Sequence, residues 1–322
     1  MPFQYEEFDL SGIQTYPLKS RPSKARVEDF ARKVEPPASI GTFVASLPNT
    51  LAGADFKAIV AAIVAARRNQ GGVLWGFGAH VIKTGLGPVL IDLMERGFVS
   101  ALATNGASVI HDFEIALAGA TSEDVDSTLG PGRFGMADET GRLLNKAIID
   151  GVGRGLGLGQ SVAAYLGEHE PQFARVSVLA AAHRLGIPVT VHVALGTDII
   201  HMHPAASGAS IGEGSLRDFR FFVSHVARLE RGVYLNCGSA VVLPEVFLKA
   251  VALVRNRGAA LASLTTVDLD FIRSYRPQKN VVMRPTAESG RGYSLVGHHE
   301  IMIPLLAAAI VDGDAQSHRV IG

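Results

Sequence analysis

The sequence is poor in cysteine and in net charge, and each deficit excludes a class of protein. A single cysteine among 322 residues excludes a disulfide framework and a zinc site built from cysteines. The 30 Lys and Arg residues balance 30 Asp and Glu residues, which excludes nucleic-acid binding through bulk positive charge. We therefore expect no nucleic-acid partner and a reducing, cytoplasmic setting.

Long apolar runs are also missing. The two longest, Ala58–Ala66 and Ile301–Val311, fall short of the roughly 20 residues that a membrane-spanning helix needs. The first ten residues, MPFQYEEFDL, include acids and lack the apolar segment of a secretory signal. The sequence thus predicts neither a membrane partner nor secretion.

The composition that remains is that of a globular protein, with 48% hydrophobic and 19% charged residues. From residue 54 onward, short apolar runs alternate with longer amphipathic segments. The predicted strands are Val73–Phe77, Val99–Ala103, Ile187–Ala194, Val233–Leu235, Ala259–Thr265 and Val281–Met283. The predicted helices are Asp55–Arg68, Pro88–Arg96, Val109–Leu117, Asp138–Asp150, Phe173–Leu185, Leu216–Leu229, Leu243–Arg255 and Ile301–Ile310. This alternation predicts an α/β fold with a doubly wound, mainly parallel sheet, whose ligands bind at the carboxyl ends of the strands.

The chain is expected to divide into an N-terminal arm (1–50), one α/β domain (51–312) and a C-terminal tail (313–322). The arm carries closely spaced prolines and six bases: Lys19, Arg21, Lys24, Arg26, Arg32 and Lys33. It is expected either to pack on the body or a neighbouring subunit, or to be a solvated lead-in. With the Ala-rich helix that follows, it favours a homo-oligomer, a dimer or a tetramer.

Several familiar motifs fail on spacing or context. Neither Gly151–Gly159 nor Gly76–Gly78 gives the G-x-G-x-x-G order, and no P-loop is present. Ser210 lies in a G-x-S-x-G pattern, but no strand precedes it as a nucleophile elbow requires. Cys237 follows a predicted strand and is either a nucleophile or a small buried apolar residue.

Histidines give a stronger signal than these motifs. His192, His201 and His203 lie within twelve residues, with Asp198 among them. Imidazoles with one carboxylate can bind a metal ion such as Zn²⁺ or Fe²⁺, and His298 is a candidate fourth ligand. The alternative is that each histidine is a polar residue near a loop. Two further histidine sites are His298–His299 before Glu300, and His111 beside Asp112.

One segment resembles a known family. Residues 99–118, VSALATNGASVIHDFEIALA, resemble the part of deoxyhypusine synthase where an apolar strand enters a Thr-Ala-Gly-Gly turn and acids open a helix. Further matches follow in the same order and extend over about residues 73–310. They lie at Gly78–Gly85, Glu213–Phe222, Gly232–Gly258 and Ile303–Leu306.

The resemblance implies a Rossmann-like NAD-binding fold, transfer of an aminobutyl group from spermidine through a lysine imine, and a homotetramer with active sites at subunit interfaces. It also implies a set of cofactor-binding residues. These are Thr104, Asn105, Gly106, Glu213, Gly238, Ser239, Thr265 and Thr266, with Glu213 as the acid that holds a ribose. Asp218 matches the acid that pairs with the polyamine.

The sequence departs from that family where its chemistry is performed. The imine-forming lysine has no counterpart in Val281–Ser294, where no lysine occurs, and the nearest lysine is Lys279. Pro244 and Glu245 stand where that family has a histidine pair. Relative to that family, Val193–Gly212 reads as an insertion. An imine mechanism cannot proceed without its lysine, so we do not expect deoxyhypusine synthesis.

Three hypotheses follow. The first is a divergent deoxyhypusine synthase-like enzyme that binds NAD and removes a hydride from a small amine or amino acid. In it His203 or His111 is the general base, and Asp218 and Glu245 anchor the cationic substrate. The second is a metal-dependent hydrolase or lyase on the same fold, with His192, His201, His203 and His298 as ligands. The third is a non-catalytic nucleotide-binding protein.

Overall fold

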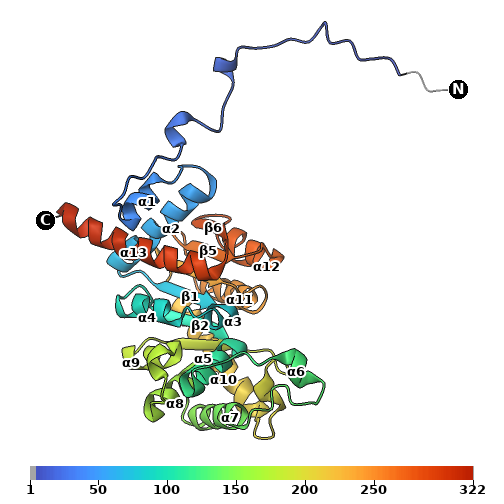
Figure 1. The fold of residues 1–322 in the computed structure, drawn as a ribbon, viewed down its shortest axis with the longest axis vertical. Coiled ribbons are helices and arrows are strands. Elements are labelled where there is room, and N and C mark those ends of the chain that lie inside the picture. The colour runs from blue at the N-terminus through green and yellow to red at the C-terminus, as the bar shows by residue number, and fades with distance from the viewer. Residues whose placement is uncertain (1–4, 322) are drawn as a thin grey trace.

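The computed structural model describes residues 5–321, with side chains described for residues 5–315. Its centre is a six-stranded sheet in the order β3-β2-β1-β4-β5-β6, and every neighbouring pair is parallel (Figure 1). The strands are β1 (Val73–Phe77), β2 (Ala101–Asn105), β3 (Val189–His192), β4 (Val233–Cys237), β5 (Thr265–Asp270) and β6 (Arg291–Val296). The expected doubly wound, Rossmann-like α/β fold is therefore confirmed.

Alternating side chains of the strands enter two separate hydrophobic cores. In β1, Val73, Trp75 and Phe77 join the larger core, whereas Leu74 points to the other face of the sheet and joins the smaller one. Both faces are buried, which is why these strands are almost continuously apolar.

Helices pack on both faces of the sheet, and their bounds are as follows. They are α1 (Ile40–Ser46), α2 (Leu51–Arg68), α3 (Ala79–Lys83), α4 (Gly87–Glu95), α5 (Gly106–Ala118), α6 (Val125–Leu129), α7 (Asp138–Gly153), α8 (Leu158–His169), α9 (Val178–Leu185), α10 (Gly208–Val226), α11 (Val242–Asn256), α12 (Tyr275–Pro277) and α13 (His299–Ile321). Short 3-10 helices are η1 (Leu18–Ser20), η2 (Val27–Asp29), η3 (Ala174–Val176) and η4 (Ile199–Met202), and η5 (Gln278–Met283) is a π-helix. The larger core includes residues of α2, α4, α5, α8, α9 and α13, and the smaller one residues of α10 and α11.

The strand order reverses between β1 and β4, because β1 leads outward to β2 and β3 while β4 leads outward to β5 and β6. In open parallel sheets such a reversal leaves room for ligands outside the carboxyl ends of the strands. That edge of the sheet is the place to look for a functional site.

Two sequence predictions in the second half of the chain are wrong. The strand expected at residues 259–265 lies further on, because β5 begins at Thr265. Val281–Met283, expected as a strand, belongs to η5, where Val281 is fully buried. A short apolar run does not distinguish a strand from a buried helical segment. The actual sixth strand, β6, is only half-buried along most of its length and lacks the continuous apolar pattern.

The glycine-rich run at residues 151–159 serves close packing. It ends α7 and begins α8, a helix that the sequence did not predict. A Cβ at Gly151 would lie 2.1 Å from Ser161 Oγ, and one at Gly159 would lie 2.3 Å from Val189 O. Glycine at these two positions therefore allows α8 to approach both α7 and β3.

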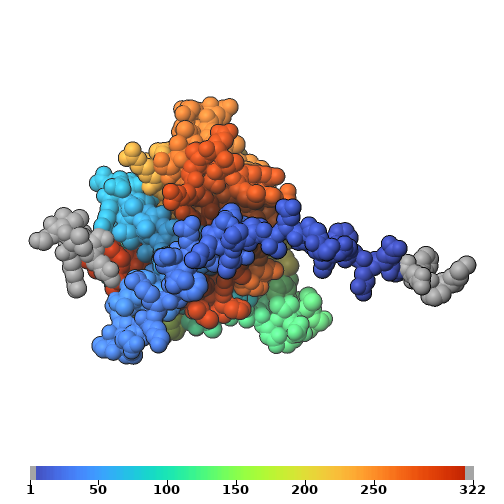
Figure 2. Space-filling model, turned by 90° about the horizontal axis from the view of Figure 1, so that it is seen from above, coloured from blue at the N-terminus to red at the C-terminus, as the bar shows by residue number. Residues whose placement is uncertain are grey.

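Residues 5–28 are exposed throughout and extend away from the body (Figures 1 and 2). Residues 29–32 bond to the segment just before α2: Asn49 N donates to Asp29 O, and Arg32 N donates to Ser46 O. At the other end, α13 continues to Ile321, through most of the expected tail. The division at residues 50 and 312, and the homo-oligomer, stay predictions. No helix in the described residues is long and apolar enough to cross a membrane.

Candidate functional site

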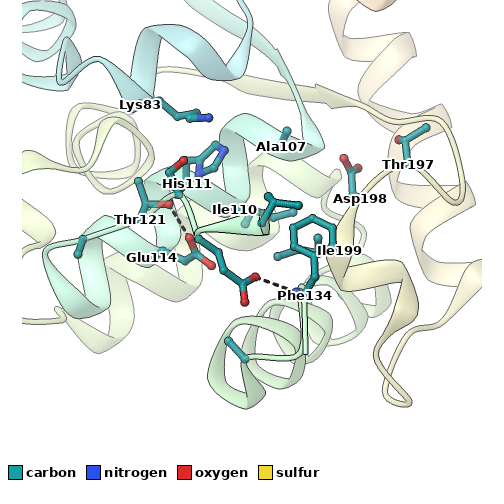
Figure 3. A pocket seen from close by; sticks show the side chains of 16 residues that line it. Lys83, Ala107, Ile110, His111, Glu114, Thr121, Phe134, Thr197, Asp198 and Ile199 are labelled. Carbon is teal, nitrogen blue, oxygen red and sulfur yellow. Dashed lines mark hydrogen bonds between the residues drawn. The ribbon is translucent and has the colours of Figure 1, made fainter. Parts of the chain in front are cut away.

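A cavity of about 550 Å³ lies beside helix α5 at the β2–β3 side of the carboxyl edge; we call it the α5 cavity (Figure 3). It is lined by α5, by the loop and helix α6 that follow it, by Lys83 of α3, and by the loop after β3. The ionisable residues in its wall are Lys83, His111, Glu114, Glu123 and Asp198.

Helix α5 supplies one wall because its residues repeat at helical spacing. Ala107, Ile110, His111 and Glu114 occupy positions i, i+3, i+4 and i+7 and therefore share a face. The helix begins where the side chain of Asn105 accepts from Ser108 N at 3.0 Å, and it ends at Gly119 in the left-handed conformation (φ 70°).

A chain of hydrogen bonds orients His111. Thr121 Oγ1 donates to Glu114 Oε2 at 2.5 Å, and Thr140 Oγ1 donates to Glu114 Oε1 at 3.0 Å. His111 Nδ1 lies 2.7 Å from Thr121 Oγ1. The single hydroxyl proton of Thr121 is committed to the carboxylate, so His111 Nδ1 must donate to Thr121. In neutral His111 the other nitrogen, Nε2, is therefore the unprotonated one.

The surroundings keep His111 neutral. Burial is the main cause that lowers the pKa of its imidazole, and the Lys83 ammonium lowers it further, while Glu114 acts in the opposite direction. A neutral imidazole with a free Nε2 in a cavity wall can accept a proton, so His111 has the form of a general base.

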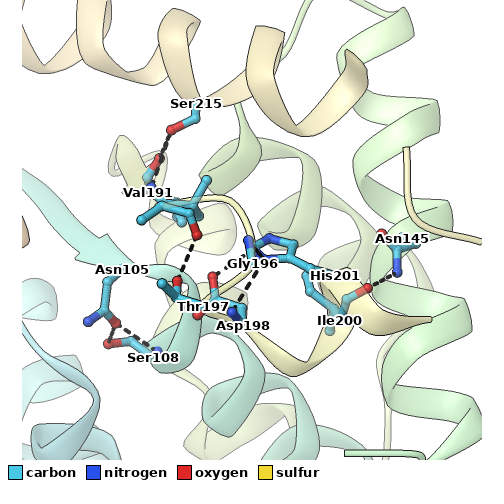
Figure 4. A network of polar contacts seen from close by, with 12 residues as sticks. Asn105, Ser108, Asn145, Val191, Gly196, Thr197, Asp198, Ile200, His201 and Ser215 are labelled. Carbon is cyan, nitrogen blue, oxygen red and sulfur yellow. Dashed lines mark hydrogen bonds and ion pairs between the residues drawn. The ribbon is translucent and has the colours of Figure 1, made fainter. Parts of the chain in front are cut away.

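Asp198 and His201 form a second polar group at this cavity (Figure 4). His201 Nδ1 accepts from Gly196 N at 3.1 Å and from Asp198 N at 3.3 Å. Its Nε2 lies 3.8 Å from Asp198 Oδ2, beyond hydrogen-bond distance, and neither atom has a hydrogen-bond partner in the described part of the chain. Burial raises the pKa of the Asp198 carboxyl, and His201 opposes that rise.

Several of the predicted cofactor residues lie at the carboxyl edge. Asn105 and Gly106 end β2 and begin α5, while Gly238 and Ser239 follow β4. Gly238 has φ 71°, and a Cβ at Gly78, after β1, would lie 2.4 Å from Gly238 O. A Cβ at Gly238 would lie 2.5 Å from His299 Cε1, so these glycines let the chain pack closely at the reversal of strand order, beside the amino end of the 13-residue helix α5.

Other predicted cofactor residues are placed elsewhere. Thr104 is buried within β2, where its hydroxyl donates to Phe77 O at 2.8 Å. Thr265 and Thr266 begin β5 and so lie at the opposite edge from Gly238; the expectation that they follow a strand is wrong. Glu213 is exposed on α10 and paired with Arg217.

Two predicted substrate anchors are already engaged by the chain itself. Asp218 is fully buried, and its Oδ2 accepts from Gly159 N at 2.9 Å and from Val191 N at 2.8 Å. Burial is the main cause that raises its pKa to about 7. Glu245 accepts from Asn280 Nδ2 at 2.9 Å and also pairs with two cations, Lys249 and Arg276. Both carboxylates thus have partners within the chain, although Asp218 Oδ1 has no hydrogen-bond partner in the described residues.

The predicted metal-ligand histidines do not converge. His192 is buried in β3, and its Nε2 lies 3.2 Å from Thr190 Oγ1. His203 Nδ1 accepts from Ala205 N, and its ring packs against Gly141 of α7. His298 is exposed beside Phe271, after β6. In residues 5–315, no three His, Cys, Asp or Glu side chains are grouped so that they could hold a metal ion.

The two candidate nucleophiles also have structural surroundings. Ser210 lies in the first turn of α10, where its amide is capped by Ser207, and no strand precedes it. Cys237 is fully buried at the end of β4, and burial raises the pKa of its thiol. A buried thiol with a raised pKa is a poor nucleophile.

Sequence reasoning missed most of the cavity. It named His111 and Asp198, but not Lys83, Glu114, Thr121 or Glu123. The signal for Glu114 was its position three residues after His111 on an expected helix, which places both side chains on one face. Lys83 and Glu123 come from separate segments and carry no local signal.

The comparison with protein families concerns the part of the chain that includes α5. A family model described as arginine dihydrolase ArgZ-like, C-terminal, Rossmann fold, matches residues 57–133. That range includes β1, β2 and all of α5. No match was found among curated proteins.

Solved structures match over most of this chain at low identity. The LOR/SDH-type protein of Methanococcus maripaludis S2 is 16% identical with a TM-score of 0.53, and the match covers 88% of this chain and 75% of that one. AgrE in its ternary complex with ornithine and NAD⁺ is 18% identical with a TM-score of 0.53, covering 84% of this chain and 35% of AgrE. The cyanobacterial arginine dihydrolase ArgZ is 16% identical with a TM-score of 0.50, covering 83% and 34%.

This chain therefore spans about a third of ArgZ and AgrE, and the likeness establishes the Rossmann-like fold. The resemblance to deoxyhypusine synthase is supported only in part. The family model that matches is the ArgZ-like one, over residues 57–133.

Proposed function

We propose that this protein is an NAD-binding enzyme that removes a hydride from a small amino acid or amine held in the α5 cavity. The orientation of His111 by Thr121 and Glu114 carries this proposal, because it leaves an unprotonated imidazole nitrogen in the wall of a cavity. AgrE, a structural neighbour, was solved with ornithine and NAD⁺, and that complex supports both the cofactor and the class of substrate.

The carboxyl edge would hold the cofactor. The pyrophosphate would lie at the strand ends where the order reverses, beside Gly238 and Ser239 after β4 and Asn105 at the end of β2. When bound, NAD would supply the acceptor for a hydride. Glu213 is not part of this proposal, because it is exposed and paired with Arg217.

The residues of the α5 cavity would bind the substrate and take its proton. The Lys83 ammonium would pair with the substrate carboxylate. His111 Nε2 would accept the proton that leaves the substrate amine, and the hydrogen bond through Thr121 to Glu114 would stabilise the imidazolium that forms. The surrounding apolar residues, among them Ile110 and Phe134, would limit access of water.

The proposal is tested by calorimetric titration of the full chain with NAD, followed by incubation with single amino acids and analysis of products by mass spectrometry. We expect NAD to bind and an oxidised or deaminated product to form from at least one amino acid. Absence of NAD binding, or product formation that survives His111→Gln unchanged, would refute it.

A further inference from the structure

One carboxylate in the α5 cavity is not accounted for by the base and its relay. Glu114 has both oxygens engaged by threonine hydroxyls, and Glu123 accepts from Gly135 N at 2.8 Å. Asp198 is 9% exposed, and its Oδ2 has no hydrogen-bond partner in the described residues. A buried carboxylate oxygen without a partner is costly and needs an explanation.

Two contacts fix the position of the Asp198 carboxylate. A Cβ at Gly106 would lie 1.9 Å from Asp198 Oδ2, so only glycine leaves room for the carboxylate against the first turn of α5. On the loop side, η4 is fixed to α7, because Asn145 Nδ2 donates to Ile200 O at 2.9 Å (Figure 4). Asp198 is thus held from both sides, with Oδ2 enclosed and without a hydrogen-bond partner in the described residues.

The imidazole of His201 lies next to Asp198 Oδ2. Two backbone amides donate to its Nδ1, so in the neutral ring the proton resides on Nε2, 3.8 Å from Asp198 Oδ2. Asp198 Oδ2 is thus enclosed between Gly106 and His201, while the Asp198 side chain also lines the cavity. In Figure 3, Lys83 and Asp198 lie on opposite sides of the first turns of α5, with Ala107 and Ile110 between them.

We propose that Asp198 binds an ammonium group of the substrate remote from the group that pairs with Lys83, and so selects substrates that carry this second charge. His201 is the positioning residue, because its Nε2 lies beside Asp198 Oδ2 and leaves the other carboxylate oxygen, Oδ1, for the ammonium. The inference rests on the proposed function, because it assigns a specificity residue to the same cavity. Asp198 takes the role predicted from the sequence for Asp218 and Glu245, neither of which lines the α5 cavity.

The test compares L-ornithine with L-norvaline, which has the same carbon chain without the terminal amine. The full chain is titrated calorimetrically with each in the presence of NAD. We expect ornithine to bind about 10- to 100-fold more tightly, the ratio that one charge-assisted hydrogen bond contributes. Asp198→Asn should bring this ratio close to one, chiefly by weakening ornithine binding.

Three further variants make the result decisive. Asp198→Ser repeats the test should the asparagine variant not fold. Asp92→Asn is the matched control, because Asp92 is exposed on α4 and pairs with Arg96 away from the cavity, so the ratio should not change. Glu123→Gln removes the other carboxylate that could bind the ammonium. If the preference for ornithine over norvaline is lost in Glu123→Gln but kept in Asp198→Asn, the proposal is overturned.

The two proposals fail differently. If the unaltered protein binds ornithine and norvaline equally, the assignment of Asp198 is wrong while the proposed function stands. If it binds neither amino acid, the α5 cavity is not the substrate site, and both proposals are wrong.

Discussion

The carboxyl edge of the sheet carries two contrasting surfaces. On the β2–β3 side, ionisable groups line a cavity; among the described residues, Asp198 Oδ2 has no hydrogen-bond partner and His111 bonds only through Nδ1. On the β5–β6 side, acids are engaged by the chain: Asp268 Oδ1 accepts from Asn236 and its Oδ2 from Gln278. The second surface instead exposes apolar side chains, such as Phe271.

The difference separates two uses of a charged residue. An acid whose oxygens are all occupied by the protein's own donors stabilises a loop or a helix end, whatever its place at the edge. An acid or base that is buried and oriented, keeps an atom without an internal partner and also lines a cavity is a candidate to bind a ligand. The following experiments test this distinction, from the largest expected effect to the smallest.

His111→Gln should have the largest effect. Removal of a positioned general base typically lowers turnover by about 100- to 10,000-fold, while the fold should be little affected, since the ring lies in a cavity wall. Turnover of the best amino-acid substrate and the melting temperature are measured together. His298→Gln on the β5–β6 side is the control and should retain turnover. An equal loss of turnover in both variants would show that the two sides of the edge do not differ in this way.

Asp112→Ala should affect stability most strongly. This carboxylate lies on the buried face of α5 and both its oxygens are used: it accepts from Ser177 Oγ at 2.6 Å and from the amides of Val178 and Leu179. Its removal leaves three buried donors at the start of α9, and we expect a loss of about 3 kcal/mol in the free energy of unfolding. Denaturant titration measures it, and Asp92→Ala should change by less than about 0.5 kcal/mol.

His192 should make stability depend on pH. Burial lowers its pKa to about 3 from 6.5, so the folded state holds it neutral. As pH falls below 6.5 the unfolded chain takes up this proton and the folded chain does not, so stability falls by about 1.4 kcal/mol per pH unit until pH approaches 3. Urea titrations of His192→Gln should lack this slope. An unchanged slope would show that other groups cause it; exposed His169→Gln serves as the control.

Glu245→Gln should have the smallest effect. Its carboxylate is partly exposed and paired with Lys249 and Arg276, so we expect less than about 0.5 kcal/mol of destabilisation and unchanged amino-acid affinity. Calorimetric binding and thermal melting measure both quantities. A marked loss of substrate affinity would restore Glu245 as the anchor that the sequence predicted.

The sequence predicted the strands with continuous apolar character, β1, β2 and β4, to within two residues, because burial on both faces leaves a clear pattern. It misplaced β5, whose six residues include Asp268 and Asp270, since acids inside a strand hide its apolar periodicity. It found His111 and Asp198 because histidines and acids near strand ends stand out. The partners Lys83, Thr121 and Glu123 come from separate segments and meet only through the tertiary fold.

Asn145 has a consequence for how this chain can change in evolution. Its amide nitrogen donates to Gly141 O within α7 and to Ile200 O after β3. The segment between His192 and Ile200 is therefore fixed at one end by β3 and at the other by α7, which constrains its length. Insertions or deletions in that interval would move Asp198 out of register with Gly106. The opposite wall of the α5 cavity, around residues 120–137, is instead joined to itself through Glu123 and Gly135. We therefore expect natural length variation among relatives to concentrate in residues 120–137, where the cavity can be reshaped without displacing its carboxylate.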